Sequence, residues 1–133
     1  KPFETTADLI ELLDKHAPRH REYKYYAQVF QAIRIEVNDE MGALKDFLMQ
    51  SAEVLKPGGR LVVESYHSLE DRMVKNFIKT GKLIEEVEKD FFGNPIKPLN
   101  AITRKPITAS EEELKINNRA RSAKLRIAEK LGE

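Results

Sequence analysis

The stretch that decides the fold reads Pro57-Gly58-Gly59-Arg60-Leu61-Val62-Val63-Glu64-Ser65-Tyr66-His67-Ser68-Leu69-Glu70-Asp71-Arg72. A Gly-Gly turn leads into an apolar, β-branched run, and a polar cluster follows that opens a helix. This order predicts a strand over 60–66 and a helix from Ser68 to about Lys79. Consecutive apolar residues favour a strand that is buried on both faces in a parallel sheet. Because ligands bind outside the carboxyl ends of strands in open α/β sheets, the polar cluster is a candidate active site.

The flanking segments predict helices before this stretch and a mixture of elements after it. A Thr5-x-x-Asp8 cap predicts an amphipathic helix that ends before Pro18. Apolar residues at three- and four-residue steps predict a long helix over 23–55, with Gly42 as a candidate break. After the helix at 68–79, whose apolar Leu69, Met73, Phe77 and Ile78 are expected to face inward, the pattern predicts further short elements. These are strands over 83–87, 101–108 and 122–128, and a short helix capped by Ser110.

Composition bounds the class of protein. The chain has 133 residues, enough for one ordinary domain or two small pieces, and 41% apolar with 34% charged residues is typical of a soluble globular chain. The net charge is only +1, but residues 97–130 hold nine Lys or Arg against four Glu, which favours an acidic or phosphate-bearing partner. The absence of cysteine excludes disulfides and favours an intracellular, cytoplasmic protein. No apolar run is long enough to cross a membrane, and the chain starts at Lys1, which indicates a piece of a longer protein.

The polar cluster at 65–72 has a chemical and a structural interpretation. His67 is a candidate for acid–base chemistry, because the unperturbed pKa of an imidazole is about 6.5, although an isolated loop histidine is more often structural. Ser68 and Asp71 have the spacing of a capping box, and Glu70 with Asp71 also suits the positive end of a helix dipole. Arg72 can bind a phosphate or pair with a nearby acid. These residues lack a recognised metal spacing, so no metal site is predicted.

Two further groups of polar residues can contact a ligand or RNA. Arg34 and Asn38 lie on one side of a helix together with Gln31, although a solvated face with helix ion pairs is the simpler interpretation. Four cations near the end of the chain suit phosphate contacts or a solubilising surface, namely Arg119, Arg121, Lys124 and Arg126. No glycine-rich nucleotide motif is present, because Gly58-Gly59 precedes a strand instead of following one.

Motifs at 30–40, 55–61, 67–75, 103–107 and 118–126 stand in one order along nearly the whole chain. They read FQAIRIEVNDE, LKPGGRL, HSLEDRMVK, TRKPI and NRARSAKLR. Together they closely resemble the MraW/RsmH family of bacterial S-adenosylmethionine-dependent methyltransferases, which act on a cytidine in the decoding region of 16S rRNA. The resemblance implies an α/β fold, with a helical insertion subdomain and a Rossmann-like class I methyltransferase sheet.

The resemblance also implies how this chain divides. Residues 1–56 are expected to form part of the helical insertion. Residues 57–133 are expected to form the C-terminal part of the methyltransferase sheet, as strand-helix-strand-strand, and the sheet is incomplete. The last of these strands, the seventh of the family's sheet, is expected to run antiparallel between the other two.

Site residues are likewise implied by the resemblance. The target-base side of the cleft, and thus catalysis, is assigned to His67, Ser68, Glu70 and Asp71. RNA binding is assigned to Arg34, Asn38, Arg72, Arg119, Arg121, Lys124 and Arg126. Tyr66 stands where the family pattern has Phe. No cofactor-binding residue is expected in this chain, because the family's glycine-rich loop, ribose-binding acid and Asp-bearing loop belong to a front half that is missing.

The function implied is part of an S-adenosylmethionine-dependent methyltransferase acting on N4 of a cytidine in 16S rRNA. The cofactor is expected only in the full-length enzyme, and the isolated chain is expected to be inactive. The expected partner is 16S rRNA in the small ribosomal subunit, and the exposed sheet edge is a candidate for self-association. The alternatives are a non-catalytic RNA-binding module, and a hydrolase using His67 with Glu70 or Asp71, for which no nucleophile or metal is evident.

Overall fold

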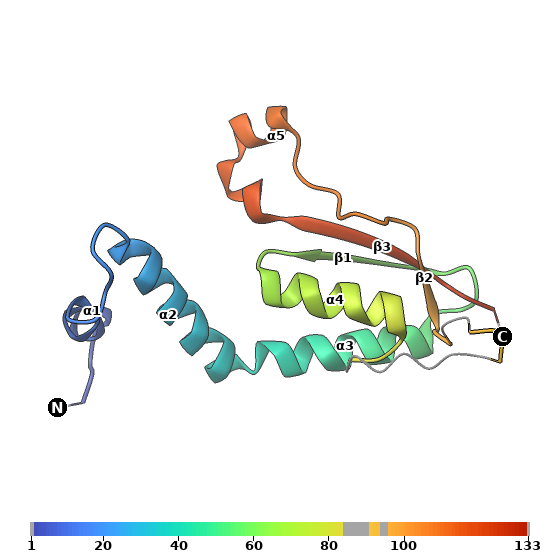
Figure 1. Cartoon of the computed structure of the whole chain (residues 1–133), viewed down its shortest axis with the longest axis horizontal. Coiled ribbons are helices and arrows are strands. Elements are labelled where there is room, and N and C mark those ends of the chain that lie inside the picture. Colours follow the sequence, from blue (N-terminus) through green and yellow to red (C-terminus); the bar gives the residue numbers. More distant parts are fainter. Residues whose placement is uncertain (1, 84–90, 94–95, 133) are drawn as a thin grey trace. The chain divides into compact units, whose positions relative to one another are not determined.

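The computed structural model describes residues 2–83, 91–93 and 96–132 (Figure 1). These residues form two compact units, 1–41 and 42–133. The elements in chain order are α1 (Thr6–Asp14), α2 (Glu22–Asn38), α3 (Glu40–Val54), β1 (Arg60–Ser65), α4 (Ser68–Thr80), β2 (Leu99–Ala101), α5 (Glu111–Ile116), the 3-10 helix η1 (Asn118–Ser122) and β3 (Lys124–Lys130). The predicted division at residue 56 concerns the whole protein and stays a prediction.

The first unit consists of helices α1 and α2, and α1 begins directly after the predicted cap at Thr5. The Thr5 side chain accepts a hydrogen bond from the Asp8 N–H, and the Asp8 carboxylate accepts from the Thr5 N–H at 2.9 Å. The Tyr26 hydroxyl donates to Asp14, which links the two helices and raises the pKa of Tyr26 to about 12. The predicted capping box is therefore confirmed.

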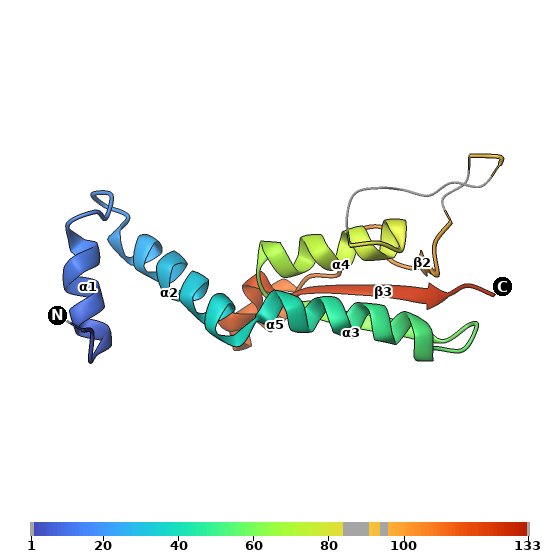
Figure 2. The same cartoon turned by 90° about the horizontal axis from the view of Figure 1, so that it is seen from below.

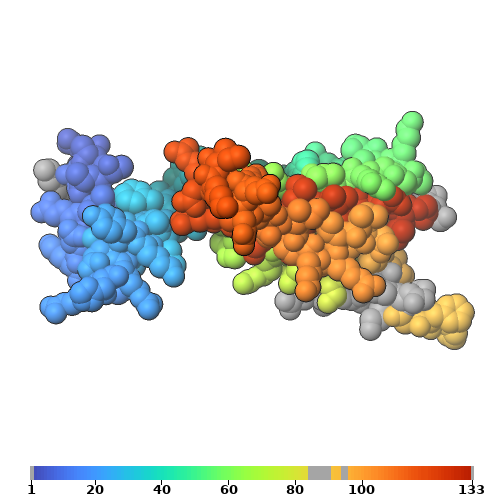
Figure 3. Space-filling view, turned by 90° about the horizontal axis from the view of Figure 1, so that it is seen from above, coloured from blue at the N-terminus to red at the C-terminus, as the bar shows by residue number. Residues whose placement is uncertain are grey.

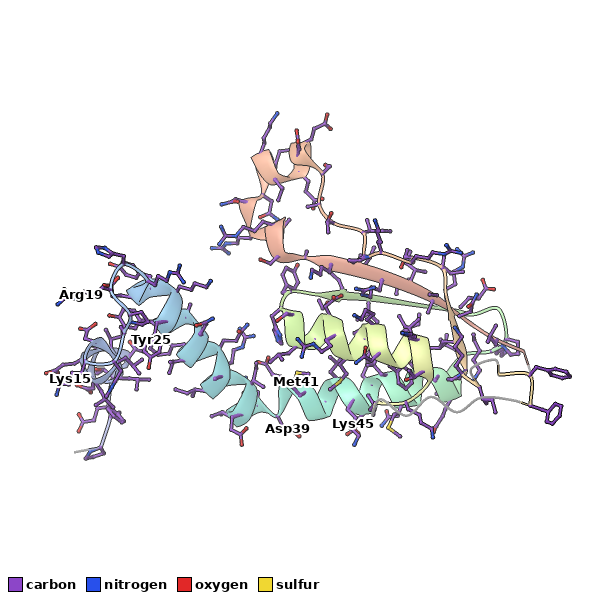
Figure 4. The ribbon with its side chains drawn as sticks, viewed as in Figure 1. Lys15, Arg19, Tyr25, Asp39, Met41 and Lys45 are labelled. Carbon is purple, nitrogen blue, oxygen red and sulfur yellow. The ribbon has the colours of Figure 1, made fainter. Side chains whose placement is uncertain are left out.

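The long predicted helix is interrupted at Asp39 and not at Gly42. Asp39 adopts a left-handed conformation with φ 47° and ends α2, and Figure 4 shows it at the junction of α2 and α3. Aspartate tolerates this conformation better than most residues because its short side chain bonds locally. Gly42 lies inside α3, so the expected break was three residues too late.

The second unit is built on a three-stranded sheet in the order β1-β3-β2. Strand β3 is antiparallel to both neighbours, with Val62 opposite Ile127 in one pair and Asn100 opposite Glu129 in the other. The last strand therefore lies between the other two, as the family resemblance implies. In the described residues, the second edge of β1 has no partner strand.

Helices α3 and α4 pack against one face of this sheet (Figures 1 and 2). The core between them is made of Leu48, Ala52, Leu61, Val63, Val74, Phe77, Ile78, Leu99 and Ala128. Burial of β1 alternates, and Val62 on the opposite face is 53% exposed. The prediction that β1 is buried on both faces was wrong for this chain, because the described helices cover one face only.

Strand β3 presents an unexpected residue to the helices. Its helix-facing side carries buried Arg126 and Ala128, whereas the more apolar Leu125 and Ile127 are only partly buried on the other side. Lys130 is the last residue of β3. Its Nζ donates a hydrogen bond of 2.7 Å to the Ala52 carbonyl, near the C-terminus of α3. A cation there complements the negative end of the helix dipole.

Several predicted details need correction. In α4 the inward apolar residues are Val74, Phe77 and Ile78, whereas Leu69 is 46% exposed and Met73 is partly buried against the core. The strand expected over 101–108 is replaced by β2 and a single bridge from Ile107 to Leu125. The expected Ser110 cap is present on α5. Most of the strand expected over 83–87 lies outside the described residues.

Gly81 ends α4 and admits a neighbouring segment at very short range. Its φ of 71° is left-handed, and a Cβ built there would lie 2.5 Å from Pro98 Cδ and 3.2 Å from Lys97 Cα. Two constraints therefore require glycine at position 81: the left-handed backbone conformation and the close approach of residues 97–98. This contact brings the segment that leads into β2 against the end of α4.

We expect Gly81→Ala to lower the free energy of unfolding by clearly more than the roughly 1 kcal/mol that a left-handed alanine alone costs. Gly58→Ala is the matched control, because Gly58 has φ 81° but no atom within 4 Å of its built Cβ. Urea unfolding followed by circular dichroism measures both. An equal loss of unfolding free energy in the two variants would show that the clash with Pro98 adds nothing to the cost of the left-handed alanine.

Candidate active site at the carboxyl end of β1

The candidate site lies where β1 ends and α4 begins. Ser65 ends the strand and is 4% exposed, Tyr66 and His67 form the turn, and Ser68 opens the helix. His67 is the N-cap, and its Nδ1 accepts from the Glu70 N–H at 3.4 Å. The cap therefore begins one residue before the predicted Ser68–Asp71 box, and Ser68 is exposed.

Glu70 reaches back across this turn. Its Oε2 accepts from the Tyr66 N–H at 3.0 Å, and its Oε1 lies 3.3 Å from His67 Nε2. The second contact is close enough for an ion pair with an imidazolium but is not aligned as a hydrogen bond, so Nε2 is buried without a hydrogen-bond partner among the described residues. His67 and Glu70 are thus held together, and their side chains are 10% and 26% exposed.

Asp71 points into the sheet side of the site and binds Arg126. Arg126 Nε donates to Oδ1 at 2.7 Å and Nη2 donates to Oδ2 at 3.0 Å, with both side chains about nine-tenths buried. The two parallel hydrogen bonds are the geometry in which a guanidinium binds a carboxylate most strongly. The hydrogen bonds from Arg126 lower the pKa of Asp71, and Lys124 Nζ at 3.8 Å from Oδ2 adds to the effect.

Tyr66 lies on the opposite face of the turn. It is 56% exposed, and hydrogen bonding to Glu64 raises the pKa of its hydroxyl. Both side chains belong to the sheet face that the described helices leave uncovered. The Tyr66 hydroxyl therefore already has a hydrogen-bond partner, the Glu64 carboxylate.

The predicted RNA-binding residues of the second unit fall into two groups. Arg119 and Arg121 are exposed on η1, and Arg72 is exposed on the first turns of α4. Lys124 and Arg126 instead converge on Asp71, and Arg126 is 7% exposed. The sequence did not predict this pairing. The sequence signal that could have indicated it is the position of Arg126 between Leu125 and Ile127 in a predicted strand.

The two predicted RNA-binding residues of the first unit, Arg34 and Asn38, both contact Glu40. Arg34 Nε lies 2.7 Å from Glu40 Oε1, and Asn38 Nδ2 donates to the same oxygen at 3.4 Å. The expectation that Arg34 and Asn38 share one side of α2 agrees with this arrangement. Arg34 remains 57% exposed.

Comparison with known proteins identifies the family to which this chain belongs. The family model described as the MraW methylase family matches residues 1–131, and the chain belongs to this family.

Its relatives carry the name ribosomal RNA small subunit methyltransferase H. The chain is 59% identical over 130 residues to the protein of that name from Cytophaga hutchinsonii, and 58% identical over 131 residues to that from Flavobacterium johnsoniae. Each match covers 98% of this chain and 43% of the relative. The chain therefore spans less than half the length of these relatives. None of its described helices has the length and apolarity needed to cross a membrane.

We expect Asp71→Asn to lower the free energy of unfolding at neutral pH by about 3–5 kcal/mol, because it leaves Arg126 buried without its counter-charge. The folded-state pKa of Asp71 lies below the ordinary value of 3.8, so the stabilisation is complete above that pH and is lost as the pH falls through the lowered pKa. Urea unfolding of the wild type and variant between pH 7 and pH 2 measures this.

The difference in the free energy of unfolding between wild type and Asp71→Asn should shrink toward zero as the pH approaches 2. Asp46→Asn, on an exposed position of α3, is the control and should change stability little at any pH. A difference that stays constant down to the lowest pH would contradict the ion-pair interpretation.

Proposed function

We propose that the full-length protein is an S-adenosylmethionine-dependent methyltransferase that methylates N4 of a cytidine in 16S rRNA, and that this chain supplies the target-base side of its active site. Membership of the MraW methylase family and relatives named rRNA methyltransferases support the class of reaction. The observation that carries the site assignment is the pairing of His67 with Glu70 at the carboxyl end of β1.

The chemistry of cytosine explains what such a pair can do. The exocyclic amine is a poor nucleophile because its lone pair is delocalised into the ring, so it must be oriented by hydrogen-bond acceptors and must lose a proton on methylation. His67 Nδ1 accepts the Glu70 N–H, which places the proton of a neutral imidazole on Nε2, facing Glu70 Oε1. We propose that the Glu70 carboxylate accepts the amine hydrogen bond and the proton, and that the His67 imidazole holds this carboxylate in place.

Asp71 and Arg126 take different roles in this proposal. Their mutual, buried hydrogen bonds fix the first turn of α4 against β3. We therefore propose that Asp71 positions the His67–Glu70 turn and that Arg126 acts through Asp71. RNA contact then falls to the exposed Arg72, Arg119 and Arg121, with Lys124 beside them and Arg34 and Asn38 in the first unit.

The residues of this chain do not fit the methyl-donor cofactor. The turn between β1 and α4 carries Tyr66 and His67, and Gly58-Gly59 lies at the opposite end of the strand. A nucleotide cradle needs glycines where a strand meets a helix, so that the backbone can approach the ligand. We propose that the cofactor site belongs to the part of the protein outside this chain.

Two features of the sheet support a larger fold. The outer edge of β1 is unpaired among the described residues, and Val62 is 53% exposed on the uncovered face. We propose that the remainder of a Rossmann-like sheet continues from this edge in the full-length protein. In the isolated chain, the same edge is available for self-association.

We expect His67→Asn in the full-length protein to reduce kcat for methylation of small-subunit RNA by roughly 10²-fold, the scale of a misplaced catalytic group, because the imidazole that holds Glu70 is lost. Asparagine is a good N-cap, so this variant keeps the helix start while removing the imidazole. The measurement is transfer of a labelled methyl group, with unfolding monitored in parallel.

Asp46→Asn serves again as the control, because Asp46 is exposed on α3 away from the turn. Unchanged activity in His67→Asn would remove the imidazole from the mechanism. Lost activity together with lost stability would assign His67 a structural role only.

We expect calorimetric titration of this chain with S-adenosylmethionine to show no binding, whereas the full-length protein binds. Binding by this chain alone would contradict the placement of the cofactor site. If the full-length protein also fails to bind the cofactor but binds RNA, the alternative of a non-catalytic RNA-binding module is favoured.

A further inference from the structure

A basic groove lies on the second unit beside the candidate site. It has a volume of about 340 Å³ and runs between α4, the segment entering β2 and the segment leaving it. Its charged lining is entirely cationic, and consists of Lys75, Lys79, Lys97, Arg104 and Arg126. Figure 3 shows the orange segment after β2 next to the yellow-green surface of α4.

Most of these cations lack an acidic partner within the described part of the chain. Arg126 is paired with Asp71, and Lys97 Nζ lies 3.5 Å from the neutral side-chain oxygen of Asn100. Lys75, Lys79 and Arg104 are each in no ion pair of the described residues, and all three are exposed. Lys75 also acts electrostatically on Asp71, but that carboxylate is bound to Arg126. The groove therefore keeps an excess of positive charge, and an anion bound there relieves the repulsion between its cations.

The groove is formed by rigid elements. Lys75 and Lys79 are four residues apart and therefore lie on one face of α4, about 6 Å apart along its axis. Lys97 is held against the end of this helix, because Gly81 allows its Cα to approach so closely. The backbone positions that carry Lys75 and Lys79 on one side and Lys97 on the other are thus held close together.

The groove adjoins the candidate site through Arg126, which binds Asp71 and lines the groove. Lys75 and Lys79 follow Asp71 at steps of about one helical turn, so they extend from this pair toward the C-terminus of α4. A polyanion that passes Arg126 therefore meets further cations along α4.

Resting on the proposed function, we propose that this groove binds the sugar-phosphate backbone of the RNA strand that leads away from the target cytidine. A strand presents a phosphate at every nucleotide, which matches cations spread along a groove better than a single small anion does. The lining offers few aromatic or base-reading groups, so these contacts position the strand and carry no sequence information. Lys75, Lys79, Lys97 and Arg104 thereby join the RNA-binding surface.

The test combines Lys75→Ala, Lys79→Ala and Arg104→Ala in the full-length protein. The matched control removes two exposed cations of α3 and the turn after it, Lys45→Ala with Lys56→Ala. Figure 4 shows Lys45 on α3. The probe is a fluorescein-labelled RNA fragment of the decoding region, and binding is followed by anisotropy over a range of salt concentrations.

We expect the triple variant to bind the RNA at least about tenfold more weakly at low salt, and its salt slope to fall by about 2–3, since each phosphate contact contributes about 0.7–0.9. The KM for methylation should rise while kcat stays near the wild-type value. Affinity and slope equal to those of the Lys45/Lys56 control would overturn the proposal.

Failure of the proposed function is recognised separately, in the wild type. A wild-type protein that binds the RNA without methylating it would refute the proposed reaction, and the groove would still be tested by the affinity of the triple variant. A wild-type protein that does not bind the RNA would refute both.

Discussion

The arrangement of the second unit depends on the bidentate ion pair between Asp71 and Arg126. The two faces of β3 differ in polarity, because Lys124, Arg126, Ala128 and Lys130 alternate with Leu125 and Ile127. A slip of one residue would therefore place an apolar side chain against Asp71 and leave this buried carboxylate without its counter-charge. The buried carboxylate accepts hydrogen bonds only from a guanidinium at one position of β3. The pair therefore fixes which face of β3 meets the helices and how the first turn of α4 sits on the sheet.

The candidate site uses neighbouring acids for separate tasks. Glu70 bonds the backbone of the turn and faces His67, whereas Asp71, one residue later, points to the sheet. This division follows from helix geometry, since successive residues project about 100° apart. The Asp71 carboxylate is therefore fixed by Arg126, whereas the Glu70 carboxylate remains partly exposed at the turn. The chemistry proposed for His67 and Glu70 therefore rests on a support that contributes no reactive group itself.

Much of this arrangement was predictable from sequence because its signals are local. The Thr5 and Ser110 caps, the 60–65 strand and the helix after it follow from short patterns. The placement of β3 between β1 and β2 followed only from the family resemblance. The break at Asp39 was missed because glycine is the stronger general signal, although it is Asp39, and not Gly42, that adopts a positive φ. The Asp71–Arg126 pair was missed because its members are 55 residues apart, and no local pattern reports such a contact.

The order of the strands has a kinetic consequence. Strand β1 pairs with β3, so residues near 60 must meet residues near 129, whereas the other neighbour of β3, β2, is much nearer in the sequence. Closing a loop of that length costs conformational entropy, and non-local pairing of this kind slows folding. Among the described residues, β1 has no sheet partner until the segment that contains β3 has been synthesised. In the isolated chain, Leu61 and Val63 therefore reach their final surroundings late, because Ala128 of β3 belongs to the same core.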